Sequence, residues 1–277
     1  MKGLIVTADD FGIADEVNDA VEQGHRDGIL TAASLMVSAT AAGDAAALAK
    51  KMPRLRVGLH IVLVEGKPTL PPSAIPDLVD ASGMFHADMT SAAMRMFFLP
   101  TVRRQLEAEV EAQFDAFRAT GLTLDHVNTH KHFHLHPTIA SIILRVGRRY
   151  DLRAIRVPLE PRRLLARIEP ANNVKPAVAT VPWAMLSRAR FRAAGLLVPD
   201  QVFGLSWSGA MTAARLLGLI ENLPDGLSEI YLHPATQPYQ GCAPHYRYAE
   251  ELAALIAPRI VEASRNSAVT RGGFADF

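Results

Sequence analysis

Residues 125–137 carry a polar side chain at every second position, and five of these six side chains are imidazoles. The six positions are His126, Asn128, His130, His132, His134 and His136. Because successive side chains of a strand point to opposite faces, an extended backbone places the first four on one face. Neutral imidazole is the commonest metal ligand in proteins. The spacing therefore predicts a cation-binding face, with a purely structural histidine cluster as the alternative.

Two adjacent carboxylates, Asp9 and Asp10, follow a short apolar stretch near the amino terminus. Neighbouring side chains at a strand end point in different directions, so the two groups can divide two tasks. One carboxylate can bind a cation while the other accepts a proton from water. For Asp10 taken alone, the alternative is an N-cap of the helix expected to begin at Ala14.

Two further histidines, His60 and His233, also follow apolar stretches. With Asp10 and His130, His60 completes a set of one carboxylate and two imidazoles, which leaves positions open for water and substrate. Two imidazoles favour zinc, while magnesium, manganese and iron stay open. A histidine at the position of His233 could donate a proton to a leaving group near neutral pH. The alternatives are a core position for His60 and a turn position for His233.

Arg156 ends another apolar stretch, at residues 154–157. Its guanidinium offers a fork of donors that could orient a carboxylate or a sugar hydroxyl of a substrate. A helix cap or a surface ion pair is the alternative for this residue.

The elements that must position these residues alternate along the chain. Short apolar runs rich in β-branched residues predict strands at 3–8, 30–37, 55–61, 122–127, 154–157, 201–205 and 229–232. Longer patterns predict helices at 14–26, 41–51, 101–118, 138–149, 212–222 and 248–264. This alternation indicates an α/β protein with a mainly parallel sheet of about seven strands, open or closed into a barrel. We expect a single domain over 1–277, with insertions at about 65–100 and 158–199.

The polar residues singled out above all fall at the carboxyl ends of predicted strands. In closed parallel barrels the active site is assembled at that rim, and in open parallel sheets the ligand crevice lies outside the same ends. Core packing does not explain such a coincidence at five strands. We therefore expect these residues to converge on one site.

Composition narrows the class of protein. The 277 residues, 49% hydrophobic and 21% charged, are typical of a globular protein. A formal charge of +1 predicts no nucleic-acid partner. The chain has no glycine-rich phosphate loop after its first strand and no G-x-S-x-G motif, which disfavours nucleotide binding and a serine hydrolase. A single cysteine, Cys242, leaves no intramolecular disulfide and too few thiolates for a cysteine zinc site.

Location and surface charge can also be predicted. The apolar run after Met1 is too short for a signal peptide, and nowhere do eighteen apolar residues run together, so we expect a cytoplasmic protein that does not span a membrane. Between Arg145 and Gly195, the sequence contains twelve basic residues and three acidic ones. Such a run is usually a solvated face, and contact with an anionic membrane surface is the alternative.

Taken together, the motifs resemble those of the YdjC-like carbohydrate deacetylases, and most closely their hopanoid-biosynthesis-associated HpnK branch. The resemblance covers nearly the whole chain, and residues 5–12, 58–60, 125–137, 156–158 and 232–234 carry it. It implies a distorted (β/α) barrel that holds one divalent metal ion, zinc or magnesium. The implied metal ligands are Asp10, His60 and His130, and the implied catalytic residues are the base Asp9 and the proton donor His233.

The resemblance also implies a substrate. We expect hydrolysis of the N-acetyl group of an N-acetylglucosamine unit, carried by a hopanoid glycolipid, with release of acetate. The residues predicted to contact this substrate are Arg156, Asn128, His132 and His134. Relatives commonly have an acidic residue at the position of Asn128, so an acid role is weakened there, while an amide can still orient an imidazole or a sugar hydroxyl.

Two other functions stay open at this stage. A metal-dependent phosphoesterase would use a similar cluster, although two-metal sites usually need more bridging carboxylates. A non-catalytic hopanoid- or metal-binding protein is the third hypothesis. Peripheral contact with the inner membrane and assembly into a homodimer are further expectations that the sequence leaves undecided.

Overall fold

One sheet runs through the residues that the computed structural model describes, which are 2–170, 181–266 and 268–277. Its seven strands have the order β4-β3-β2-β1-β6-β5, with β7 beside β1, and every pairing is parallel. The strands are β1 (Lys2–Phe11), β2 (Ala32–Leu35), β3 (Arg56–Ile61), β4 (Val127–Thr129), β5 (Gln201–Phe203), β6 (Gly226–Leu232) and β7 (Val269–Arg271). The predicted α/β class with a parallel sheet is confirmed.

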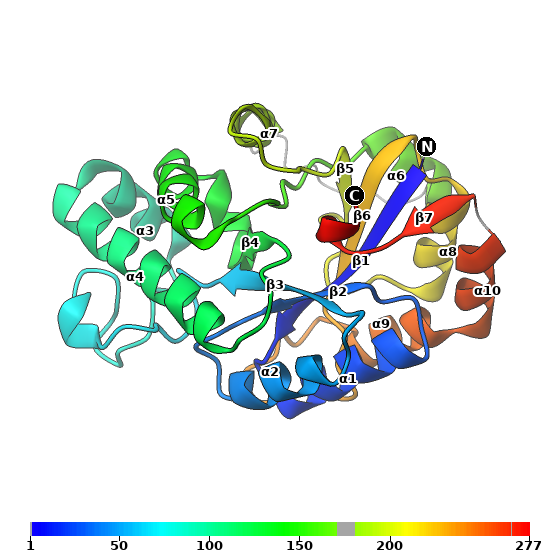
Figure 1. The fold of residues 1–277 in the computed structure, drawn as a ribbon, viewed down its shortest axis with the longest axis horizontal. Helices are drawn as coiled ribbons and strands as arrows, with labels where there is room; N and C mark the ends of the chain where they lie inside the picture. Colours follow the sequence, from blue (N-terminus) through cyan, green and yellow to red (C-terminus); the bar gives the residue numbers. More distant parts are fainter. Residues whose placement is uncertain (1, 171–180, 267) are drawn as a thin grey trace.

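Helices surround the curled sheet (Figure 1). Those that the periodicity predicts are α1 (Asp15–Arg26), α2 (Ala42–Lys50), α4 (Pro100–Ala119), α5 (Pro137–Gly147) and α8 (Ala213–Glu221). The helix predicted at 248–264 is divided into α9 (Tyr248–Ile256) and α10 (Pro258–Asn266), because a proline cannot donate the backbone hydrogen bond that a continuous helix needs. No helix in the described part of the chain is long and apolar enough to cross a bilayer.

The sheet curls into a half-barrel whose regular pairing stops between β4 and β5. The strand predicted at 154–157 is wrong, because this segment forms only isolated bridges, from Ile155 to Val127 and from Ala154 to Leu197. Further along the same segment, Leu159 accepts a backbone hydrogen bond from Val202 of β5. An irregular connection thus spans from β4 to β5, which makes the architecture a distorted barrel.

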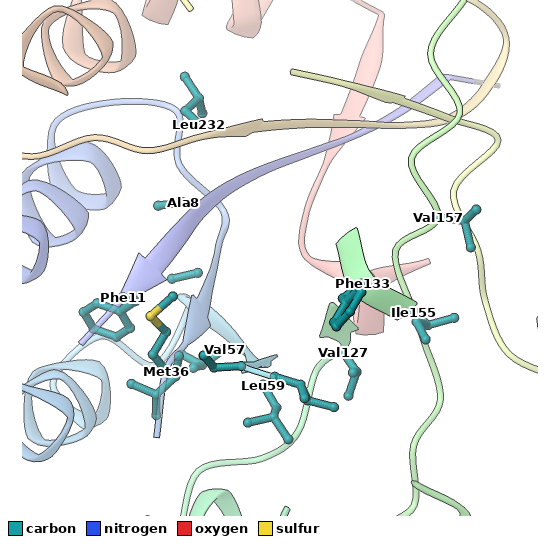
Figure 2. Close-up of a cluster of buried hydrophobic side chains, with 14 of the residues drawn as sticks. Ala8, Phe11, Met36, Val57, Leu59, Val127, Phe133, Ile155, Val157 and Leu232 are labelled. Carbon is teal, nitrogen blue, oxygen red and sulfur yellow. The ribbon is translucent and has the colours of Figure 1, made fainter. Parts of the chain in front are cut away.

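The two faces of the sheet differ in polarity. The outer face carries Val6, Ala8, Val57, Leu59, Val127 and Leu232. These side chains pack in one apolar cluster with residues such as Phe11 and Met36 (Figure 2). The alternate positions face inward and are polar at buried sites: Thr7, Asp9, Ser34, His60, Asn128, Arg156 and Glu229. A buried polar interior is costly unless every group is paired, so this face must be organised by hydrogen bonds.

An apolar layer closes the inner face at the amino ends of the strands. Ile5, Ala32, Ala154 and Leu227 form a separate buried cluster there with Phe274. Phe274 begins a short 3-10 helix, η5 (Phe274–Asp276), at the carboxyl end of the chain. Phe274 of η5 therefore closes the interior of the half-barrel at the amino ends of the strands.

Both predicted insertions contain helices that the sequence did not indicate. The first, at about 65–100, contains η1 (Pro72–Ala74) and α3 (Met89–Phe98), whose N-cap Asp88 accepts from two backbone N–H groups. The second, at about 158–199, contains α6 (Arg162–Ile168) and α7 (Val181–Ala193). Its residues 171–180 lie outside the described part of the chain.

Candidate active site

Asp10, His60 and His130 converge at the carboxyl ends of β1, β3 and β4. Asp10 Oδ1 lies 3.3 Å from His60 Nε2 and 3.5 Å from His130 Nδ1. One donor atom from each residue lies within 4.8 Å of the other two. Among the described residues, no hydrogen bond reaches Asp10 Oδ1 or His60 Nε2, although both atoms are buried. Buried polar atoms normally form hydrogen bonds. Three ligand atoms that lie close together, two of them buried without a hydrogen bond to any described residue, therefore fit a cation.

The charge of the surroundings supports the same conclusion. Three buried carboxylates lie in this region: Asp9 and Glu229 pair with the buried guanidinium of Arg156, and Asp10 lies beside His60 and His130. In their ionised forms these groups leave two uncompensated negative charges in a region shielded from water. Because unpaired buried charge is expensive, a divalent cation held by the three donor side chains would balance the site.

Backbone geometry turns Asp10 toward His60 and His130. Its φ is 62°, in the left-handed region that a residue with a side chain rarely adopts. Strain of this kind persists only where the surrounding structure enforces it. Here the register of β1 against β2 shifts between Ala8 and Phe11, and the Gly12 N–H donates to Asn18 Oδ1. This irregularity separates the two adjacent carboxylates, so that Asp9 contacts Arg156 while Asp10 lies beside His60 and His130.

The prediction that His126, Asn128, His130 and His132 share the face of one strand is wrong beyond Asn128. Strand β4 ends at Thr129, and the chain continues as a 3-10 segment, η2 (His130–Leu135). Lys131 and His132 have φ values of 56° and 53°, which break the alternation. The turn leaves His130 at the rim and directs the following histidines elsewhere.

His132 and His134 form hydrogen bonds within the protein. His132 Nε2 lies 2.9 Å from Tyr231 Oη, and His134 Nδ1 lies 2.8 Å from Thr129 Oγ1. Burial lowers the pKa of His134 to about 3, so this side chain is neutral at physiological pH. His132 is half-buried and reaches the opposite strand β6, whereas His134 is fully buried behind the site.

Arg156 lies below the rim, in contrast to the predicted contact with substrate. Its side chain is fully buried and bonds Asp9 through both terminal nitrogens, at 2.5 and 3.0 Å. Nε and Nη2 also donate to Glu229 Oε1, at 3.0 and 2.7 Å. With its donors directed at two carboxylates, the guanidinium acts as a support for Asp9.

These contacts determine the state of Asp9. Burial alone would raise the pKa of its carboxyl, but the Arg156 charge and hydrogen bonds, with the neighbouring His60 and His233, lower that pKa well below its ordinary value. Asp9 is therefore ionised throughout the physiological range. Its Oδ2 accepts from Arg156, and its Oδ1 accepts from both Arg156 and Asn128.

Asn128 connects Asp9 with the group of Asp10, His60 and His130. Its Oδ1 lies 2.7 Å from His60 Nδ1, while its Nδ2 donates to Asp9 Oδ1 at 3.1 Å and to Ser34 Oγ at 2.8 Å. The His60 Nδ1–H donates to the amide oxygen, which leaves the Nε2 lone pair directed at Asp10. Asn128 thus orients the His60 imidazole, one of the two roles expected of it.

His233 follows β6 at the same rim. Its ring lies between those of Tyr231 and Tyr246, with centroids 5.8 and 5.1 Å away. Its backbone N–H donates to Glu251 Oε2 at 2.6 Å, and burial raises the pKa of Glu251. His233 Nδ1 is buried without a hydrogen-bond partner among the described residues. The structure therefore brings five predicted residues to one rim, namely Asp9, Asp10, His60, His130 and His233.

Sequence reasoning missed Ser34, Glu229, Tyr231 and Glu251. Glu229 carries the clearest signal, because a charged side chain in the middle of an otherwise apolar buried strand needs a partner. Ser34 gives no such signal, since a serine in a strand is ordinary. Its role depends on the strands that lie beside it.

The fold and this rim define a parallel α/β half-barrel protein in which two histidines and one aspartate are placed where they could hold a cation. The YdjC-like protein family model matches residues 3–266, and the chain belongs to this family. It is 31% identical over 262 residues to a carbohydrate deacetylase of Geobacillus stearothermophilus, covering 93% of this chain and 90% of that one. It is 30% identical to a carbohydrate deacetylase of Brevibacillus brevis, covering 84% and 81% of the two chains.

Among solved structures, a protein of Enterococcus faecalis has the same fold. Its TM-score is 0.78 at 22% identity, covering 99% of this chain and 98% of that one. The role suggested for that protein is cellobiose-phosphate cleavage. At this identity the likeness concerns the fold alone.

Proposed function

We propose that this protein is a metal-dependent carbohydrate N-deacetylase. The observation that carries the proposal is the convergence of Asp10, His60 and His130 beside an ionised Asp9. The similarity to carbohydrate deacetylases over most of the chain supports it independently. When bound by these three side chains, zinc or magnesium would act as a Lewis acid that polarises the acetyl carbonyl group and makes the attacking water more acidic.

The chain's own residues would then move the protons. Asp9 accepts a proton from the attacking water, whose oxygen forms a bond to the acetyl carbon. Its Oδ2 is suited to this because, within the described part of the chain, it accepts a single hydrogen bond and keeps a second lone pair. His233, in its protonated form, donates a proton to the sugar nitrogen as the C–N bond breaks. The products are acetate and the free amine.

The finer substrate proposal is an N-acetylglucosamine unit on a hopanoid glycolipid, as in the HpnK branch. Exposed apolar side chains lie on α3 and α7, on either side of α5, the helix that follows η2. On α3, Phe97 packs against His136, the N-cap residue of α5, and Phe98 is 60% exposed. On α7, Trp183 and Leu186 are 49% and 56% exposed. Such surfaces suit an apolar aglycone or a membrane interface.

Helix α7 is tied to the same region by Arg190, which donates to Pro137 O and Ser141 Oγ of α5. Part of the basic excess is compensated, since Arg145 and Arg149 pair with Glu107 and Glu111. The exposed arginines of α6 remain for an anionic lipid surface: Arg162, Arg163 and Arg167. We propose a cytoplasmic protein with peripheral contact at the inner membrane, in which residues 1–277 act as one domain.

Acetate release tests the activity directly. Purified protein is incubated with N-acetylglucosaminyl hopanoid and, separately, with diacetylchitobiose, each with and without a chelator. Release from the lipid-linked sugar that the chelator abolishes is the expected result. Preference for chitobiose would overturn the lipid assignment, and no release from either sugar would overturn the deacetylase. Two metal ions per chain with phosphate release from phosphorylated sugars would instead identify a phosphoesterase.

A further inference from the structure

A series of hydrogen bonds runs from Phe274 and Ala275 to His60. It begins at Asp125, whose Oδ2 accepts from Phe274 N–H at 3.1 Å and whose Oδ1 accepts from Ala275 N–H at 2.9 Å. Asp125 Oδ2 also lies 2.9 Å from His126 Nδ1. An ionised carboxylate only accepts hydrogen bonds, so His126 must carry its proton on Nδ1.

The next two links are equally directed. His126 Nε2 lies 3.0 Å from Ser34 Oγ, and in the neutral form of the ring with its proton on Nδ1 this nitrogen accepts from the hydroxyl. Ser34 Oγ in turn accepts from Asn128 Nδ2 at 2.8 Å. This bond, with that to Asp9, uses both amide protons of Asn128, so its oxygen faces His60. The two acceptors Asp9 and Ser34 thus determine the orientation of the Asn128 amide.

The His126 ring is held on both sides. Phe274 stacks on one face, with ring centroids 4.2 Å apart and an interplanar angle of 19°. On the other face lies Gly58 of β3, where an added Cβ would come within 2.5 Å of the imidazole. Asp125, His126, Ser34 and Asn128 are each no more than 4% exposed. The imidazole therefore cannot turn without displacing either β3 or Phe274.

We infer that Asp125, His126 and Ser34 are positioning residues for the metal site, which act through Asn128 to hold His60 with its Nε2 free. This inference rests on the proposed function and deepens it by assigning a role to Phe274 and Ala275, whose backbone N–H groups hold Asp125. Partners of metal-binding histidines fix the tautomer and the ring orientation. Here the support extends through four side chains from one end of the barrel to the other.

Zinc affinity of Ser34→Ala, measured by competition with a chromophoric chelator, tests the inference. Ser228→Ala is the matched control, because Ser228 is also a fully buried strand serine and accepts a hydrogen bond from Gln201. We expect Ser34→Ala to weaken zinc binding about tenfold, as is usual for such partners, and Ser228→Ala to bind like the wild type. Equal affinity in the wild type and Ser34→Ala, or an equal loss in both variants, would overturn the inference.

A spectroscopic measurement on the metal-free protein provides a second readout. A long-range proton–nitrogen NMR spectrum of the wild type should show His126 and His60 each as the Nδ1–H tautomer. In Ser34→Ala, or in Asp125→Asn if the first variant does not fold, the His60 signals should become those of a tautomer mixture. Unchanged His60 signals would contradict the inference. Neither readout uses a sugar, so failure of the deacetylase proposal would be seen separately in the acetate assay.

Discussion

Asp9 and Arg156 form a doubly hydrogen-bonded ion pair, at 2.5 and 3.0 Å, although 147 residues separate them along the chain. Neither side chain is more than 3% exposed. The same guanidinium holds Glu229, so one cation supports two carboxylates inside the barrel. The pair connects the stability of the fold with the ionisation of the proposed catalytic base.

Removing this cation should destabilise the protein strongly. Arg156→Ala leaves Asp9 and Glu229 buried without their partner, and breaking a buried pair in this way typically costs about 3–5 kcal/mol. Urea denaturation would measure the loss. The control is Arg118→Ala, which breaks an exposed pair with Asp115 and should cost less than about 1 kcal/mol. Similar free energies of unfolding for the two variants would contradict this account.

Metal binding and turnover should be separable at the two adjacent carboxylates. Asp10→Ala removes a ligand and should leave the protein without bound zinc, as should His130→Ala. Asp9→Asn keeps all three ligand side chains, so it should retain zinc while its turnover falls by about 10²–10⁴-fold, the usual loss for a general base. Metal analysis and acetate release on the same preparations give the comparison. Full turnover by Asp9→Asn would exclude Asp9 as the base.

Stability should fall in acid partly through Asp125. Burial alone would raise the pKa of this carboxyl, but hydrogen bonds from His126, Ala275 and Phe274 bring it below its ordinary value of 3.8. A group with a lowered pKa in the folded state stabilises the protein above its unfolded pKa. That contribution is lost as the pH falls below about 4, through the folded pKa.

Asp125→Asn should therefore lower the free energy of unfolding at pH 7, by about 1–3 kcal/mol for the unpaired buried donors. The variant should also lose less stability than the wild type between pH 5 and about pH 3. Denaturation at several pH values measures both effects. Parallel stability curves for the two proteins would mean that Asp125 does not contribute to the acid sensitivity.

A methyl group added at Gly58 should displace the His126 ring and destabilise the protein. The added Cβ would meet the His126 ring at 2.5 Å, and overpacking of this kind typically costs about 1–3 kcal/mol. Gly43→Ala is the control, because it lies in α2 with open space around its Cβ position. That change should stabilise the protein by about 0.5–1 kcal/mol. Thermal denaturation distinguishes the two, and a stable Gly58→Ala protein would show that the ring can move.

Much of the site could be predicted because parallel strands place their carboxyl ends at one rim. Asp9, Asp10, His60 and His233 each follow an apolar strand, and local sequence was sufficient to identify them. The histidine-rich segment was predicted less well. Its alternation indicated one long strand, but the left-handed residues Lys131 and His132 end the strand after Thr129. Short-range patterns do not reveal such a turn, since neither residue is a glycine.

The sequence by itself determined which residue types reach the rim, because the period of a strand fixes the face of each side chain. Only the tertiary structure decided what those side chains contact. Arg156 supports Asp9, and His126 packs under Phe274, because sheet order and register bring together residues more than a hundred positions apart. Hydrogen bonds in a buried interior depend on distances of a few tenths of an ångström, and that precision arises only once the barrel is assembled.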